Sequence, residues 1–107
     1  MKDPKPFIKT LSAKRRFKRL LGVSGESRGM RSGLVALKPG ESIGWHSTEH
    51  KEEALIILEG RGKVYLGKKT VTACGSSFVY LPRGTCHNVK NTGTGILKYV
   101  YLTSQPR

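Results

Sequence analysis

Short apolar runs separated by turn residues dominate the chain from residue 34 onward. The runs occupy residues 34–38, 54–59, 63–67, 69–74, 77–81, 87–91 and 96–103. Most of them end at Gly or Pro, and none has the length and the spacing of three and four that an amphipathic helix requires. Short runs with frequent turns are typical of antiparallel strands in a sandwich or barrel. The pattern therefore predicts an all-β domain.

The run at residues 54–59 carries two predictions about how the strands are arranged. Only Gly-Arg-Gly at 60–62 separates it from the run at 63–67, and this spacing predicts a hairpin. Leu55 and Ile57 point to one side of the strand, and the apolar residues between and beside them point to the other. Because both faces are apolar, we expect a second copy of the chain to cover the outer face. The protein is therefore predicted to be a homodimer.

The N-terminal third has a different pattern. Two prolines in residues 1–13 disfavour a helix and predict an extended arm. The basic run "KRRFKRLL" at 14–21 fits either one or two turns of helix or a basic edge strand. The Gly- and Ser-rich residues 22–33 predict a loop with a short strand at its end. We expect residues 1–33 to be a basic arm of the same domain and residues 34–107 to form its barrel.

Length and composition narrow the class of protein. The chain has 107 residues, which suits one domain with one modest core. No apolar run approaches the roughly 20 residues that span a membrane, and the first ten residues lack the apolar segment of a signal peptide. The expected location is therefore the cytoplasm. In that reducing compartment, Cys74 and Cys86 are expected to be free thiols.

The chain is strongly basic, with a formal net charge of +13. Residues 1–33 hold ten Lys and Arg against two acids, which gives +8, and residues 34–107 hold ten against five, which gives +5. Such a field attracts anions, including nucleic acids, phosphorylated metabolites and acidic membranes. Charge runs are usually solvated, and residues 14–31 contain one aromatic, Phe17, and no recognised nucleic-acid motif. We therefore expect a small anionic ligand rather than a nucleic acid or a membrane.

Candidate chemistry gathers in "HSTEHKEE" at residues 46–53, which holds two of the three histidines of the chain. In a straight strand, His46 and His50 would share a face. Imidazole and carboxylate groups from different strands can meet inside a barrel, and this ligand set suits Zn, Fe, Mn, Ni, Co or Cu. Spacing alone leaves open that the histidines are ordinary core or surface residues.

Two segments resemble the conserved motifs of the cupin superfamily. Residues 39–60 and 75–91 supply, at the family's intervals, Gly40, His46, Glu53 and Gly60, and then Pro82, Gly84, His87 and Asn91. The leading glycine of the second motif is displaced by one residue. The resemblance covers residues 34–103 and is to a small single-domain cupin of the conserved-barrel type 2. It implies an antiparallel double-stranded β-helix, or jelly-roll barrel, with a short hairpin at 61–74.

The resemblance also implies a metal site. The usual set of ligands would be His46, Glu53 and His87, with one place vacant because Thr48 stands where the family has a second histidine. His50 lies two residues further along and is the candidate replacement. The expected ligands of a divalent transition metal are therefore His46, His50, Glu53 and His87.

We do not expect the other residues near these motifs to be metal ligands. Glu49 and Glu52 have the wrong parity or spacing for ligands and are expected in solvent. For Trp45 we expect a place in the core or at a dimer interface rather than the alternative of stacking on a ligand at the barrel mouth, and Cys86 should face away from the site. The side chain of Asn91 is expected to bond to the backbone.

The resemblance implies two kinds of function. The first is isomerisation, oxygenation or decarboxylation of a small sugar or organic acid at the metal. The second is non-enzymatic binding or sensing of a metal or small ligand, which the threonine at position 48 favours slightly. The sequence leaves open which of these applies, which metal is bound and which substrate is used.

Overall fold

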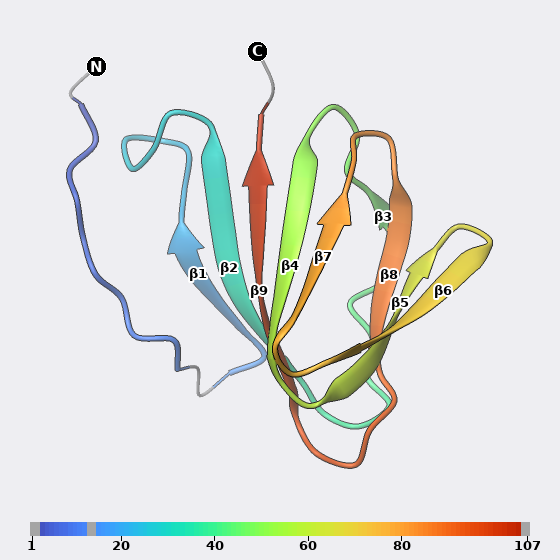
Figure 1. Ribbon diagram of the computed structural model, residues 1–107. Coiled ribbons are helices and arrows are strands. Elements are labelled where there is room, and N and C mark those ends of the chain that lie inside the picture. The colour runs from blue at the N-terminus through green and yellow to red at the C-terminus, as the bar shows by residue number, and fades with distance from the viewer. Residues whose placement is uncertain (1–2, 13–14, 106–107) are drawn as a thin grey trace.

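Nine strands build the part of the chain that the computed structural model describes, which is residues 3–12 and 15–105 (Figure 1). They are β1 (Phe17–Leu21), β2 (Met30–Leu37), β3 (His46–Ser47), β4 (Glu52–Glu59), β5 (Arg61–Leu66), β6 (Lys69–Cys74), β7 (Ser77–Leu81), β8 (Cys86–Asn91) and β9 (Leu97–Ser104). The described residues contain no α-helix, so none of them forms a helix that could cross a membrane. The predicted all-β class is confirmed.

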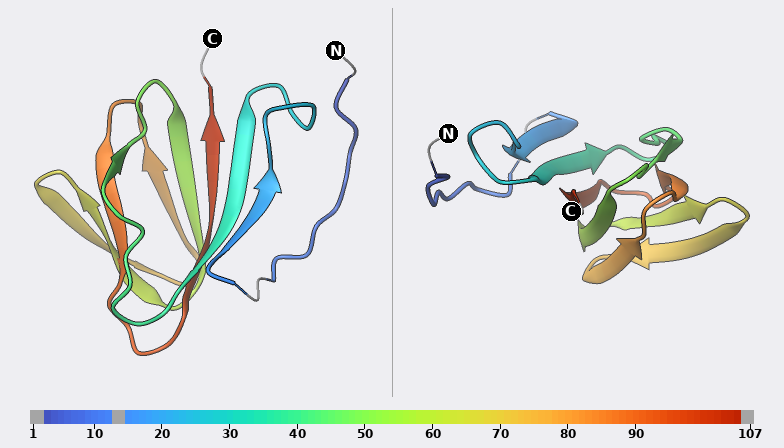
Figure 2. Two further views of the ribbon diagram at one scale, coloured as in Figure 1. Left: turned by 180° about the vertical axis from the view of Figure 1, so that it is seen from behind. Right: turned by 90° about the horizontal axis from the view of Figure 1, so that it is seen from above.

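The strands form two antiparallel sheets that face each other (Figure 2). The larger sheet has the order β1-β2-β9-β4-β7, and the smaller has the order β3-β8-β5-β6. Strands that are neighbours in sequence often lie in different sheets, so the chain crosses repeatedly from one sheet to the other. Each crossing brings side chains that are distant in sequence to the same interior.

The core lies between the inner faces of the two sheets. Its buried members are Val35, Leu37, Leu55, Ile57, Val64, Ala73, Leu81, Val89, Leu97 and Tyr99. β4 shows the alternation that the sequence predicted, because Glu53, Leu55 and Ile57 are buried whereas Ala54 and Ile56 are half-buried on the other face. Glu53 therefore points inward with two core residues, as its parity requires.

The hairpin predicted between residues 54–59 and 63–67 is wrong. β4 pairs with β7 and β9, whereas β5 pairs with β6 and β8 in the other sheet. Gly60 joins them at a φ of 91°, and the β4–β9 register shifts between Ile57 and Glu59. A bulge and a left-handed glycine turn the chain sharply enough to leave one sheet and enter the next. The hairpin expected at 61–74 is present as β5 and β6.

The basic run near the N-terminus is an edge strand rather than a helix. β1 pairs with β2 alone, and the ring of Phe17 stacks on Tyr101 of β9 with centroids 6.2 Å apart. That contact holds β1 in the sheet, which local helical spacing could not reveal. β2 begins at Met30, so the boundary expected at residue 33 lies inside a strand. Residues 13 and 14, at the junction of the arm and the basic run, lie outside the described residues.

The arm at residues 3–12 runs beside β1 (Figure 1). Lys9 Nζ donates a hydrogen bond of 2.9 Å to the carbonyl of Leu20, and Lys18 Nζ donates one of 2.9 Å to Thr10. Three arginines of the basic region lie beside acids, in the pairs Arg16–Glu41, Arg19–Glu26 and Arg28–Asp3. Exposed pairs of this kind contribute little stability.

Candidate metal centre

His46 and His87 meet because they are directly opposite each other in the β3–β8 pair. Their ring centroids are 4.1 Å apart at an interplanar angle of 60°. His87 is fully buried, and His46 is exposed at the cavity mouth. The two motif segments, more than 40 residues apart in sequence, thus bring their histidines together through one strand pairing.

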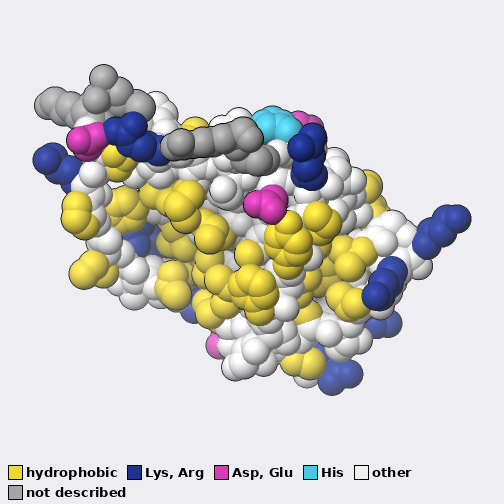
Figure 3. All heavy atoms as spheres, turned by 45° about the horizontal axis from the view of Figure 1, so that its top comes forward, with side chains coloured by type: hydrophobic (Ala, Val, Ile, Leu, Met, Phe, Trp, Pro, Cys, Tyr) yellow, Lys and Arg dark blue, Asp and Glu magenta, His cyan; other side chains and the backbone are white. Residues whose placement is uncertain are grey.

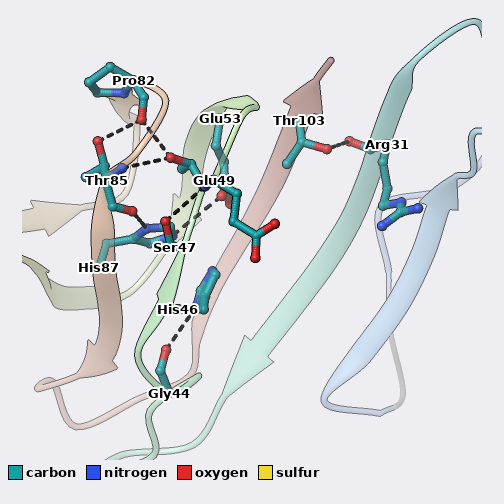
Figure 4. Close-up of polar contacts among 11 residues, drawn as sticks. Arg31, Gly44, His46, Ser47, Glu49, Glu53, Pro82, Thr85, His87 and Thr103 are labelled. Atoms are coloured by element: carbon teal, nitrogen blue, oxygen red, sulfur yellow. Dashed lines mark hydrogen bonds and ion pairs between the residues drawn. The ribbon is translucent and has the colours of Figure 1, made fainter. Parts of the chain in front are cut away.

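Glu53 reaches the same point from the opposite sheet (Figure 4). It lies on β4, is 8% exposed, and places Oε1 3.5 Å from Nε2 of His87. One ligand atom from each of His46, Glu53 and His87 lies within 4.8 Å of the other two. We refer to these three residues as the triad. Two imidazoles and one carboxylate are a ligand set that divalent transition metals accept.

Backbone carbonyls orient both rings of the triad. Nδ1 of His87 lies 3.0 Å from the carbonyl of Thr85, and Nδ1 of His46 lies 3.0 Å from that of Gly44. A carbonyl can only accept, so each Nδ1 carries the proton. In the neutral rings the lone pair is therefore on Nε2. Metal-binding histidines are usually held in this way by an acceptor on the other nitrogen.

The buried Nε2 of His87 is an observation that favours a cation in this place. It has no hydrogen-bond partner among the described residues. Its 3.5 Å separation from Glu53 exceeds the ordinary length of an N–H···O bond. A buried polar atom without a partner and a nearly buried carboxylate both cost free energy unless something satisfies them. The three residues therefore fit a divalent metal ion.

The surroundings of His87 act on its pKa in opposite directions. Burial disfavours the charged ring and lowers the pKa, but the nearby Glu53 carboxylate and the Thr85 carbonyl raise it. The net effect raises the pKa above its usual value of 6.5. A proton and a metal ion would therefore compete for the same Nε2 atom.

Thr48, which stands where the family has a histidine, links two segments next to the triad by hydrogen bonds. It is 5% exposed, its hydroxyl donates to the carbonyl of Pro82 at 2.8 Å, and it accepts from the amide of Thr85 at 2.9 Å. It thus ties the turn after β3 to the loop before β8. Since Thr85 in turn orients His87, the threonine supports the triad from outside it.

The structure does not bring His50 to the triad. β3 ends at Ser47, and Glu49 has a φ of 56°, so the strand does not run straight from His46 to His50. His50 is exposed, with its Nε2 3.0 Å from the amide nitrogen of Gln105. A shared face for the two histidines required an extended backbone that this turn interrupts. Of the four residues expected as ligands, three lie together.

A cavity of about 530 Å³ opens beside the triad. Its deeper wall is apolar and includes Val35, Leu55 and Val89, and the charged side chains that line it, besides those of the triad, are Arg31, Glu49 and Lys51. Trp45 is 54% exposed and lines the cavity as well, with its ring 6.1 Å from that of Tyr65. It therefore lies outside the core.

Sequence reasoning missed three charged residues of this cavity, Arg31, Glu49 and Lys51. Glu49 is exposed as expected, but it also lines the cavity, and its left-handed backbone there is not revealed by any sequence pattern of a glutamate. Arg31 was counted with the basic region. The sequence does hold a signal for Arg31, because it is an even number of residues from Val35 and Leu37 and would share their face of a strand. The Gly- and Ser-rich start of β2 obscured that strand.

Comparison with solved structures places this architecture among double-stranded β-helix proteins. The fold resembles a crystal structure from Bacillus halodurans with a TM-score of 0.84 and 25% identity, covering 97% of this chain and 84% of that one. It also resembles a predicted oxalate decarboxylase from Thermotoga maritima, with a TM-score of 0.79, 25% identity and coverage of 84% and 79%. Residues 33–103 match the model of the Cupin domain family. The chain belongs to the cupin family, as the two motifs implied.

Relatives at the sequence level are longer proteins. Mannose-1-phosphate guanylyltransferase 2 of Escherichia coli O157:H7 is 31% identical over 70 residues, which are 65% of this chain and 14% of that protein. The Bacillus subtilis protein YrkC is 34% identical over 79 residues, which are 68% of this chain and 42% of YrkC. The chain thus spans less than half the length of these curated relatives.

Proposed function

We propose that this protein binds one divalent transition metal ion through His46, Glu53 and His87. Cupins commonly bind divalent metals and small ligands, and this chain has a matching group of two histidines and a carboxylate. The observation that carries the proposal is the buried, partnerless Nε2 of His87 facing Glu53. Zn, Fe, Mn, Ni, Co and Cu all accept these ligands.

We propose further that the metal serves small-molecule chemistry in the adjoining cavity. Three protein ligands leave positions open, and a bound metal would polarise an oxygen of the substrate there. The apolar wall of the cavity excludes water from one side of the ligand, and Glu49 at the rim is available to accept or donate a proton. Isomerisation, oxygenation or decarboxylation of a small sugar or organic acid fits this arrangement.

The alternative is a module that binds or senses a metal or small ligand without turnover. The structural role of Thr48 favours this binding module, because the protein retains one metal ligand fewer than the family motif provides. Elemental analysis of protein purified without a histidine tag tests both functions, and assays with phosphorylated sugars and keto acids then separate them. Metal with turnover identifies an enzyme, and metal without turnover supports the binding module. Absence of any metal uptake contradicts both the enzyme and a metal-binding module.

We also propose a homodimer that buries the outer face of the five-stranded sheet. Proteins of the cupin family often form oligomers. Phe78 is 68% exposed and lies in register with Ile56 of β4, which lies in register with Val100 of β9. Hydrophobic side chains gather on the face seen in Figure 3, with few charges among them. A patch of this kind on an outer sheet face fits a second copy of the chain.

The Phe78→Ser variant is expected to weaken the dimer about tenfold or more, because exposed aromatic residues at the centre of an interface contribute most of its affinity. Light scattering over a dilution series measures the change. The control is Ile8→Ser, which removes an apolar side chain that is 98% exposed and lies outside this face. A wild-type protein that remains a monomer at micromolar concentrations would rule out the dimer.

A further inference from the structure

The lining of the cavity beside the triad includes a positively charged side chain, Arg31, that does not contact the triad. Arg31 of β2 pairs with Thr103 of β9, and Thr103 pairs with Glu53 of β4. These three residues form one row across neighbouring strands (Figure 4), and all three line the cavity. Neighbouring strands lie about 4.8 Å apart, so the row separates the Cα atoms of Arg31 and Glu53 by roughly 10 Å.

Arg31 differs from three of the other four arginines of the basic region. Those at positions 16, 19 and 28 each lie beside an acid. Within residues 3–12 and 15–105, no acceptor takes a hydrogen bond from the guanidinium of Arg31, and Glu53 faces His87 instead. The cavity thus has a metal-binding group at one side and an uncommitted guanidinium at the other.

Part of the wall between these two ends is aromatic. Tyr101 lies in the next row, between Gly33 and Leu55, and its ring stacks on Phe17 at an interplanar angle of 18°. Gly33 makes room for this pair, because a Cβ there would lie 2.5 Å from the Tyr101 ring. A ligand that reached from the triad to Arg31 would therefore pass beside Thr103 and lie against the carbon of this ring pair.

The charges of the cavity also favour an anion once a metal is bound. Arg31 and Lys51 balance the carboxylates of Glu49 and Glu53, which are the other formal charges of the lining. A divalent cation at the triad would then leave the cavity with excess positive charge. The formal net charge of the whole chain, +13, acts in the same direction.

We infer that the cavity binds a small molecule with an oxygen donor at the triad end and an anionic group, carboxylate or phosphate, at the Arg31 end. The inference rests on the proposed function, because the triad end needs the metal. Arg31 is then a specificity-determining residue, since its planar fork can hold an anion by two parallel hydrogen bonds. A neutral sugar has no anionic group for Arg31 to bind. The substrate class narrows to small organic acids and phosphorylated compounds.

Calorimetry on the Zn²⁺-loaded protein tests this with three probes: glutarate, its monomethyl ester and glycerol 3-phosphate. We expect wild-type protein to bind at least one dianion about tenfold or more tightly than the ester, which lacks the second charged end. The stronger of the two dianions identifies the anionic group as carboxylate or phosphate. Arg31→Gln should weaken that dianion about tenfold or more while leaving the ester unchanged. Arg61→Gln on β5, outside the cavity lining, should behave as wild type.

The zinc content of each variant, measured in parallel, separates this inference from the proposed function. If wild-type protein takes up no zinc, the metal function and the inference fail together. If all three proteins hold zinc but Arg31→Gln binds the dianions as tightly as wild type, the inference is wrong and the metal function stands. The inference is equally wrong if zinc-loaded wild type binds the ester as tightly as both dianions, or if it binds none of the probes.

Discussion

His87→Ala is expected to reduce the metal content of the purified protein from about one ion per chain to near zero. The ring supplies a buried Nε2 held in place by the Thr85 carbonyl, and no other described side chain reaches that position. Removal of an outer-shell partner alone costs roughly 10-fold to 100-fold in metal affinity, so the loss of a ligand should cost more. Elemental analysis after dialysis measures the effect.

His50→Ala is the matched control for this experiment. It removes the same side chain from an exposed turn beside Gln105, and it should leave the metal content unchanged. His87→Gln keeps more of the buried volume and distinguishes loss of a ligand from loss of the fold, which circular dichroism reports independently. Full metal content in a folded His87→Gln or His87→Ala variant would show that the triad is not the metal site.

The raised pKa of His87 adds a pH dependence to the same measurement. Its stabilising interaction with Glu53 in the metal-free protein is fully present below the unfolded value of 6.5, and it is lost as the pH rises through the higher folded value. Metal binding depends on pH in the opposite direction, because the ion must displace the proton from Nε2 of His87. We therefore expect metal affinity to fall as the pH is lowered through this region. An affinity that is constant across it would contradict the assignment.

Gly60→Ala is expected to destabilise the protein by roughly 2–5 kcal/mol. Gly60 has a φ of 91°, and a Cβ there would lie 2.3 Å from the carbonyl oxygen of Ile96. A left-handed conformation costs a residue with a Cβ about 1–2 kcal/mol, and overpacking typically adds about 1–3 kcal/mol. The closest atom is backbone, so no side-chain rotation can relieve the overlap. Such a change is a large part of the stability of an ordinary domain.

Gly67→Ala provides the comparison for this variant. Gly67 has a φ of 61°, and no heavy atom lies within 4 Å of an added Cβ. Only the conformational cost of about 1–2 kcal/mol should appear. Urea unfolding of both variants at one protein concentration measures the difference through the midpoint, with the slope unchanged. Equal destabilisation of the two variants would mean that the corner between β4 and β5 can move aside.

The fold was largely predictable because its signals are local and repeated. Alternation placed Glu53 on the core face of β4 with Leu55, and the motif positions of His46 and His87 turned out to be cross-strand partners. Asn91 bonds to the backbone as expected, donating at 2.8 Å to the carbonyls of Leu37 and Gly95. Each of these depends on residue type and spacing, which the sequence states directly.

The errors share a different physical origin. The sequence cannot show that Gly60 directs the chain into another sheet, because a short Gly-containing connection serves equally for a hairpin and for a corner. The positions of His50 and Glu49 depend on one left-handed residue and on the contacts of Thr48. The position of Arg31 beside the cavity depends on pairing with a strand some 70 residues away. All three are properties of tertiary packing rather than of local pattern.

The arm beside β1 has a consequence for the behaviour of the protein at high concentration. An edge strand exposes unpaired backbone groups that can recruit a strand from another molecule and start aggregation. Here the ammonium of Lys9 occupies the Leu20 carbonyl, and Lys18 links the same strand to the arm. An incoming strand would have to displace these lysines and approach a cationic surface. These contacts of the basic N-terminal segment thus disfavour strand addition at β1, and the proposed homodimer would use a different surface, the outer face of the sheet.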